Sequence, residues 1–192
     1  MIKYRKVELC DHEPLRQIYL PYVREDSVTL EYEEPTEAGF INRVAATACL
    51  FPYVVCELDG EIVGYAYAHR YKERYGYRFC AELSVYVRKG LTGHGIGKTL
   101  YKIMIDIMKA MGYKNLYGIV TDPNPASFAL HKSLGFVEVG REHNAGVKFG
   151  VWHDVVIFEK RIGDYPPGIG AEGPKRLAEI EDEMKRIIES YN

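Results

Sequence analysis

The stretch VRKGLTGHGIGKTL, residues 87–100, decides how the chain folds around it. The run that ends at its first residue, residues 83–87, mixes β-branched and aromatic residues as strands do. After the glycines, apolar residues recur three and four positions apart from Ile96 to Met111, which is the pattern of an amphipathic helix. The glycines are therefore expected at a turn between a strand and a helix.

A turn of this kind is a candidate phosphate site. The first N–H groups of a helix lack intrahelical partners and lie at the positive end of the helix dipole. Glycines let the backbone approach a ligand closely, so phosphate suits such a turn. The contacts are expected from Thr92, Gly93, His94, Gly95, Ile96, Gly97 and Lys98. The simpler alternative is a tight turn without a ligand, and glycine spacing alone leaves it open.

Two common phosphate motifs match this turn only in part. The P-loop, G-x-x-x-x-G-K-[ST], has its ending in Gly97-Lys98-Thr99, but Thr92 occupies the position of its first glycine. The dinucleotide fingerprint G-x-G-x-x-G could begin at Gly93, but Lys98 occupies the position of its third glycine.

Composition limits the class of protein. A chain of 192 residues, 47% of them hydrophobic, suits one domain with a real core. A net charge of −2 gives no general attraction to nucleic acid or membranes. The four cysteines have no C-x-x-C or metal-ligand spacing, so we expect free thiols in a reducing compartment. With no membrane-spanning run and no signal-peptide core, we expect a cytoplasmic protein without metal, nucleic-acid or membrane partners.

Hydrophobic periodicity and turn residues predict the order β-α-α-β-β-β-α-β-α-β-β. Asp59-Gly60 is a strong hairpin signal, and Asp11, Pro35-Thr36 and Asn124 mark helix starts. The expected strands cover residues 2–7, 53–58, 62–69, 78–87, 114–121, 137–142 and 151–161. The expected helices cover residues 11–23, 35–49, 96–111 and 124–135.

A Gly/Pro-rich linker, residues 162–173, is expected to divide the chain. We expect one domain of residues 1–162, followed by a segment of residues 163–192 that contains the linker and an amphipathic helix. The apolar stripe of that helix is Leu177, Ile180, Met184, Ile187 and Tyr191. Because the stripe is too short for an independent coiled coil, we favour docking on the chain's own domain. A homodimer through this helix is the alternative.

Six further segments carry a resemblance to a known family. They are GYAYA (64–68), KERYGY (72–77), AELSVYV (81–87), NPAS (124–127), LHKSLGF (130–136) and GVWHDV (150–155). Residues 92–97 also follow the GNAT pattern [QR]-x-x-G-x-[GA], with Thr92 in place of Gln or Arg. In order and spacing, these segments resemble the phosphinothricin N-acetyltransferase group of the GNAT acetyltransferases, over residues 1 to about 161.

The resemblance implies the GNAT fold and an acetyl-CoA-dependent N-acetyltransferase. That fold is an α/β (α+β) domain with a mixed, mostly antiparallel sheet, helices on both faces and a splayed pair of central strands. The implied acceptor is the primary amine of a small amino-acid-like molecule, such as phosphinothricin, methionine sulfone or methionine sulfoximine. Besides the glycine turn, the implied co-substrate contacts are Val85, Tyr86, Val87, Asn124 and Ser127. The implied acceptor contacts are Arg74, Tyr77 and Trp152.

Two residues are candidates for proton transfer. Alternation puts Glu82 on one face of its strand, and a carboxylate in an apolar strand needs a partner or a use. Acetyl transfer needs a base for the amine and an acid for the departing thiolate, and the resemblance gives these roles to Glu82 and His131. Residue type alone favours a Glu82 paired with Arg78 or another cation, and an ordinary helix-surface or interface His131.

Three other functions remain open from the sequence. The same machinery could acetylate the N-terminus of a peptide or protein. A P-loop-like nucleotide-binding protein could use Asp122 to hold Mg²⁺, although Thr92 and the small size of the chain argue against it. The last is a CoA-binding module without catalysis, which Glu82 and His131 disfavour.

Overall fold

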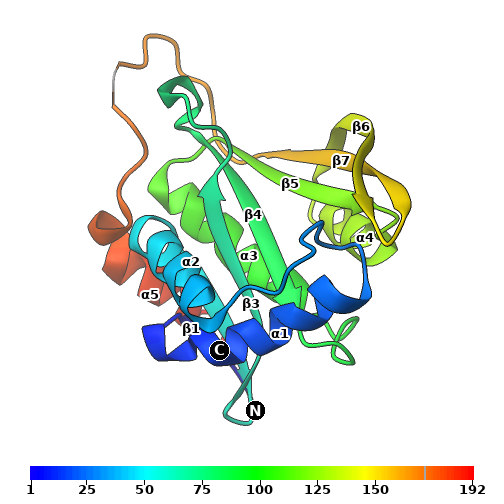
Figure 1. Ribbon diagram of the computed structural model, residues 1–192. Helices are drawn as coiled ribbons and strands as arrows, with labels where there is room; N and C mark the ends of the chain where they lie inside the picture. The colour runs from blue at the N-terminus through cyan, green and yellow to red at the C-terminus, as the bar shows by residue number, and fades with distance from the viewer. Residues whose placement is uncertain (171) are drawn as a thin grey trace.

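The computed structural model describes residues 1–170 and 172–192. The strands are β1 (Ile2–Lys6), β2 (Tyr53–Leu58), β3 (Glu61–Arg70), β4 (Cys80–Val87), β5 (Asn115–Asp122), β6 (Val137–Lys148) and β7 (Val151–Arg161). They form one seven-stranded sheet in the order β1-β2-β3-β4-β5-β7-β6 (Figure 1). Neighbours are antiparallel except β4 and β5, which are parallel. The mixed, mostly antiparallel sheet is therefore confirmed.

Helices cover both faces of this sheet (Figure 1). On one face, α1 (His12–Glu25) and α2 (Glu37–Leu50) pack on β3. On the other, α3 (Ile96–Met111) packs on β2, β3 and β4. α4 (Pro125–Ser133) packs on β5, and α5 (Glu181–Glu189) packs on α3 and β1. Short 3₁₀ turns lie at Leu9–Asp11, Tyr75–Tyr77 and Leu177–Ile180.

Side-chain caps set the starts of two helices where the sequence indicates them. Thr36 precedes α2, and its hydroxyl accepts the N–H of Gly39 at 3.1 Å. Asn124 precedes α4, and its Oδ1 accepts the N–H of Ser127 at 3.1 Å. Each bond satisfies a helix N–H that has no intrahelical acceptor.

The hairpin signal is confirmed, but the expected Asp11 cap is wrong. Asp59 and Gly60 have φ of 52° and 87°, so both are left-handed, as a tight two-residue hairpin turn requires. Asp11 makes no side-chain cap on α1. Its carboxylate accepts bonds from the Arg5 guanidinium at 2.7 and 2.9 Å and from the Glu8 N–H instead. This bidentate pair is the stronger interaction for a carboxylate.

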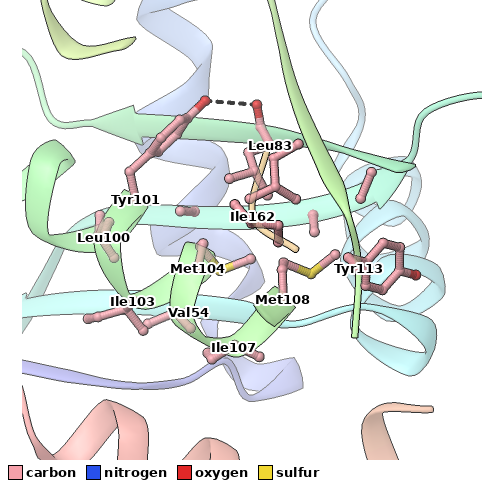
Figure 2. Packing of buried hydrophobic residues seen from close by; sticks show 14 of the residues in the cluster. Val54, Leu83, Leu100, Tyr101, Ile103, Met104, Ile107, Met108, Tyr113 and Ile162 are labelled. Atoms are coloured by element: carbon pink, nitrogen blue, oxygen red, sulfur yellow. Dashed lines mark hydrogen bonds between the residues drawn. The ribbon is translucent and has the colours of Figure 1, made fainter. Parts of the chain in front are cut away.

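The larger hydrophobic core lies between α3 and the sheet, and Figure 2 shows part of it. The stripe of α3 supplies five side chains without exposed surface: Leu100, Ile103, Met104, Ile107 and Met108. They belong to one cluster with strand residues such as Val54 and Leu83. Burying one such side chain stabilises a fold by roughly 1.5–3 kcal/mol. The same helix therefore anchors the sheet and holds the glycine turn at its own N-terminus.

The second core lies under α1 and α2 and is rich in tyrosine. The rings of Tyr53 and Tyr67 stack with centroids 5.0 Å apart, and those of Tyr53 and Tyr65 with centroids 5.7 Å apart. Tyr19 of α1 meets Tyr86 of β4 edge to face at 5.0 Å. Tyrosines that are scattered in the sequence thus converge on one face of the sheet.

The parallel strands β4 and β5 separate soon after they begin. They pair only over Cys80 to Glu82, and Figure 1 shows them diverging beyond that point. Over the rest of β4, to Val87, the described residues supply a strand neighbour on one side only, which is β3. The splayed central pair is therefore confirmed, and it leaves one edge of β4 open.

The C-terminal segment docks on the rest of the chain, as its apolar stripe predicts. Leu177, Ile180 and Met184 belong to the same buried cluster as α3. The Tyr191 hydroxyl donates to Asp106 of α3 at 2.7 Å. The side chain of the last residue, Asn192, bonds both the N–H and the C=O of Tyr4 in β1. The segment thus covers the β1 edge of the sheet.

β6 runs to Lys148, well beyond the expected end at residue 142. The pairing of β6 with β7 shifts register between Glu142 and Gly146, and Asn144 has φ of 49° in that interval. A bulge of this kind breaks the two-residue alternation that identifies a strand. Residues 143–148 therefore carried no strand signal.

Candidate active site

The glycine turn lies at the N-terminus of α3, against the open edge of β4. Gly93 and Gly95 have φ of 85° and 84°, which is the left-handed region that favours glycine. A Cβ placed on either residue would meet no atom within 4 Å, so the turn faces open space. A Cβ on Gly97 would lie 3.6 Å from the side chain of Val87, which places the turn beside β4. These features fit the phosphate groups of a nucleotide-like co-substrate.

Positive charge at the turn is only partly available to a ligand. Arg88 donates to Glu61 at 2.9 Å, and Lys89 donates to Glu25 at 2.9 Å, so both are paired. Lys98, in the first turn of α3, forms no ion pair with any residue that the structure describes. Backbone N–H groups and Lys98 are therefore the groups best placed for phosphate.

The open edge of β4 offers a ligand mainly its backbone. The side chains of Val85 and Val87 point toward α3, within 3.9 and 3.6 Å of a Cβ built on Gly97. Tyr86 points to the opposite face, where its ring meets that of Tyr19. Of the three β4 residues expected to contact the co-substrate, Tyr86 can therefore contribute only its main chain in the opening.

Two tyrosine hydroxyls hold β4 where it lacks a β5 partner. Tyr101 of α3 donates to the carbonyl of Leu83 at 2.9 Å (Figure 2). Tyr22 of α1 donates to the carbonyl of Val87 at 2.5 Å. Neither residue was identified from the sequence, because nothing local distinguishes them from other helix tyrosines.

Glu82 stands where β4 and β5 separate, and it is paired with a histidine. Its Oε1 is 3.4 Å from Nε2 of His69, its register partner on β3, and its side chain is 20% exposed. Burial alone would lower the pKa of His69, but the Glu82 carboxylate and the carbonyl of Arg70 outweigh it and the pKa is raised. Arg78, the partner that residue type suggested, binds the carbonyls of residues 170 and 172 instead.

His131 is buried, with 2% exposure. Its Nδ1 is 2.8 Å from the Ser127 carbonyl, which can only accept, so Nδ1 carries a proton. Its Nε2 is 3.2 Å from Oη of Tyr101, which in turn bonds Leu83. Burial lowers the pKa of His131, offset in part by the Ser127 carbonyl. His131 therefore favours the neutral form and reaches β4 through Tyr101.

A cavity of about 350 Å³ lies beside Glu82 on the face covered by α1 and α2. His69 lines it, so the Glu82–His69 pair stands at its border. Its aromatic walls are Tyr19, Phe40, Tyr53, Tyr65 and Tyr67. Its charged lining includes Glu31 and Arg43. The volume suits one small molecule.

The residues expected to contact the acceptor do not line this cavity. Arg74 and Tyr77 lie in the β3–β4 connection, where the Tyr77 ring meets the ammonium group of Lys72 at 5.0 Å. Trp152 lies at the start of β7 and is 64% exposed. Neither the cavity nor the role of His69 was predicted from the sequence. The alternation of Tyr65, Tyr67 and His69 along one strand was the available signal.

Asn124 and Ser127 are engaged within α4. The Oδ1 atom of Asn124 is used by the helix cap. The carbonyl of Ser127 binds His131, and its hydroxyl lies 3.3 Å from the same ring. Their immediate role is to place His131.

The described residues, 1–170 and 172–192, give little support to a metal site or to a P-loop-like function. No group of three or more His, Cys, Asp or Glu residues lies in metal-binding proximity there. Asp122, which a P-loop-like protein would need for Mg²⁺, accepts a bond from Arg141 at 2.5 Å. All four cysteines are free thiols, as expected. Within the same ranges, the helices are too short or too polar to cross a bilayer.

An open strand edge, a phosphate-type turn and a carboxylate at the strand split together define an acyl-transfer site of the GNAT type. The acetyltransferase (GNAT) domain model matches residues 5–157 of this chain. The chain belongs to this family and is an acetyl-transferring enzyme.

Named relatives and solved structures agree with this family. Phosphinothricin N-acetyltransferase of Alcaligenes faecalis is 36% identical over 154 residues, which are 79% of this chain and 78% of the relative. L-methionine sulfoximine/L-methionine sulfone acetyltransferase of Salmonella typhimurium is 32% identical over 115 residues, 60% of this chain and 67% of the relative. The crystal structure of a Sinorhizobium meliloti phosphinothricin acetyltransferase in complex with acetyl-CoA has a TM-score of 0.82 and 30% identity, covering 88% of this chain and 95% of that one.

Proposed function

We propose that this enzyme transfers the acetyl group of acetyl-CoA to the primary amine of a small amino-acid-like acceptor. The observation that carries the proposal is the position of Glu82. It stands where β4 and β5 separate, between the open edge of β4 and a cavity of about 350 Å³. Acetyl-CoA can thus occupy one side of the split while the acceptor amine reaches the same carboxylate from the other.

The co-substrate is assigned to the glycine turn and the edge of β4. The turn, residues 92–98, would hold the pyrophosphate through backbone N–H groups and Lys98, and Val85, Tyr86 and Val87 would pair with the pantetheine arm through their backbone. Asn124 and Ser127 would contact it from α4. When bound, acetyl-CoA supplies the thioester whose carbon the amine attacks. The reaction needs no metal in this scheme.

Proton transfer falls to Glu82 and His131. Glu82 accepts a proton from the acceptor's ammonium group, which frees the nitrogen lone pair for attack. As the C–N bond forms, the nitrogen releases a second proton to solvent, and as the C–S bond breaks, the thiolate needs a proton. His131 would supply it through Tyr101, because Nε2 of His131 lies 3.2 Å from the phenol oxygen that bonds Leu83. This role requires the charged form of His131, which burial disfavours, so the acid should work only at moderately low pH.

Arg74 is assigned to the carboxylate of the acceptor. Its side chain is exposed at the start of the Tyr75–Tyr77 turn and forms no ion pair with a described residue. A guanidinium suits a carboxylate because two N–H groups can bind it at once. Tyr77 and Trp152 would complete the mouth of the acceptor site. A peptide acceptor is less favoured, because the cavity has the volume of a single small molecule.

We also propose a cytoplasmic location and a homodimer. Four unpaired thiols suit a reducing compartment. The β6–β7 hairpin exposes apolar side chains on a protein of this size: Val137, Val139, Val147, Phe149, Val151 and Trp152. An exposed apolar patch marks a contact surface, and light scattering should report a dimer mass.

The test is thiol release from acetyl-CoA in the presence of single amino acids, with mass spectrometry of the product. We expect an N-acetylated amino acid and no release without an acceptor. Gly95→Val supplies the control for the co-substrate site, because a branched residue at φ of 84° is strained and would enter the phosphate position. It should weaken acetyl-CoA binding in calorimetry. Acetylation of peptides only, or unchanged acetyl-CoA binding by a folded Gly95→Val protein, would contradict the proposal.

A further inference from the structure

Building on the proposed function, we propose that the acceptor's side chain enters the tyrosine-lined cavity, which selects side chains that are polar but uncharged. The cavity is the space of about 350 Å³ bordered by His69. Because His69 contacts Glu82, an amine held at Glu82 places the rest of a small acceptor within reach of this space.

The cavity offers hydrogen-bond donors that the protein itself does not use. Tyr53 and Tyr65 are 4% and 1% exposed, and their hydroxyls bond to no group among the described residues. Among the described residues, every side-chain N or O atom that is shut off from solvent has a hydrogen-bond partner. The two unpaired hydroxyls are therefore not shut off, and they open into the cavity that both side chains line. Burial raises the pKa of both phenols, and each therefore keeps its proton. A ligand oxygen can accept these protons, and leaving buried hydroxyls unpaired is costly.

No free charge is available in the cavity to pair with an ionic side chain. Arg43 of α2 binds Glu31 of the α1–α2 loop at 2.7 Å, and the Tyr19 hydroxyl donates to the same carboxylate at 3.1 Å. On β3, His69 is paired with Glu82 of β4. The charges that face the cavity from each of its walls are therefore already compensated.

An anionic side chain is disfavoured for two reasons. It would lose its hydration without gaining a cation, which is expensive in an apolar site. It would also lie close to the Glu31 carboxylate, which lines the same cavity, and like charges repel. A neutral oxygen, such as that of a sulfone, avoids both costs and can still bind the two phenols.

Two acceptors distinguish the effect of side-chain charge from the effect of side-chain shape. Methionine sulfone and phosphinothricin have the same chain length and the same terminal methyl group, but the first carries a neutral sulfone and the second an anionic phosphinate. We expect kcat/KM to be higher for methionine sulfone by about 10-fold or more. Equal rates, or a preference for phosphinothricin, would overturn the inference while leaving the proposed function intact.

A variant that removes one charge from the cavity lining tests why the cavity disfavours an anionic side chain. Glu31→Gln keeps the shape of the side chain but leaves Arg43 without its carboxylate, so phosphinothricin should gain about 10-fold relative to methionine sulfone. The matched control is Glu34→Gln in the same loop, whose carboxylate pairs with Arg24 at the surface and which should not change the ratio. Tyr65→Phe should lower kcat/KM for methionine sulfone by about 5-fold and leave that for norleucine, whose side chain has no oxygen, unaffected. An unchanged ratio in Glu31→Gln would overturn the inference.

The failure of the proposed function would look different. In that case no amino acid would be acetylated by the wild-type enzyme. Calorimetry of methionine sulfone and phosphinothricin binding to the wild type and to Glu31→Gln would then still test the selectivity of the cavity. The inference is supported if the wild type binds methionine sulfone more tightly and if this difference in affinity is reduced or reversed in Glu31→Gln. Equal binding overturns it.

Discussion

At the scale of single residues, two histidines of the candidate site lie in contrasting environments. His69 lies beside a carboxylate, and His131 is buried against neutral groups. Burial lowers the pKa of both, but in His69 the Glu82 carboxylate and the Arg70 carbonyl together outweigh burial and raise the pKa, whereas the pKa of His131 stays lowered. The two rings should therefore hold different protonation states at a pH near the ordinary histidine value.

Proton NMR of the six histidines, with His69→Gln and His131→Gln for assignment, checks this difference. We expect His69 to titrate above, and His131 below, an unperturbed histidine. By linkage, the His69–Glu82 pair stabilises the fold fully below the unfolded histidine pKa and loses this effect as pH rises through the folded pKa. Neutral His131 stabilises the fold fully above the unfolded histidine pKa. This stabilisation is lost as pH falls through the folded pKa of His131. Two coincident titrations would contradict the assigned environments.

Residue types and local spacing identified some of these groups and missed others. Glu82 could be singled out because a carboxylate is unusual in an apolar strand. His69 could not be paired with it, because their contact depends on the register of β3 against β4 across the 71–79 connection. The contact between Tyr101 and His131 joins two helices, and no local pattern encodes it.

At the scale of elements, the C-terminal helix α5 stabilises the fold by packing on α3 and β1. Met184 is 2% exposed within the core cluster, so Met184→Ala should lower the free energy of unfolding by about 2–5 kcal/mol. Urea denaturation measures this, with Lys185→Ala as the control, because Lys185 is 75% exposed on the same helix. We expect kcat to be retained, since α5 does not line the cavity.

Deleting residues 174–192 is the stronger version of this test. The truncated chain should unfold at lower urea concentration but keep acetyl transfer wherever it is folded. A folded truncation without turnover would show that the segment takes part in the active site. In that case, residues 1–162 would not be a complete acetyltransferase domain, and residues 163–192 would share its function.

Elements with strong caps or periodicity were predictable, and those shaped by irregular pairing were not. α3 followed from its apolar stripe and α4 from Asn124-Pro125. The end of β6 did not, because the bulge near Asn144 removes the alternation. Docking of α5 could be favoured from its stripe, but its partners, α3 and β1, are distant in the sequence.

At the scale of the whole molecule, two hydrophobic cores lie on opposite faces of one sheet. α3 closes one face and carries the glycine turn, while α1 and α2 close the other and enclose the tyrosine-lined cavity. The short pairing of β4 with β5 leaves a gap in the backbone pairing of the sheet between these two faces. Element order predicted the layers, but the cavity depends on side chains from four elements and the loop that joins α1 to α2.

We expect acetyl transfer to take place at this gap, with Glu82 as the proton acceptor. The most direct measurement is kcat for transfer from acetyl-CoA to methionine sulfone by the wild type and by Glu82→Gln, with acetyl-CoA binding measured in parallel. Glu82→Gln should lower kcat by roughly 10²-fold or more and leave acetyl-CoA binding unchanged, because the glycine turn lies at the far end of β4. A folded Glu82→Gln enzyme with the wild-type kcat would show that Glu82 is not the proton acceptor.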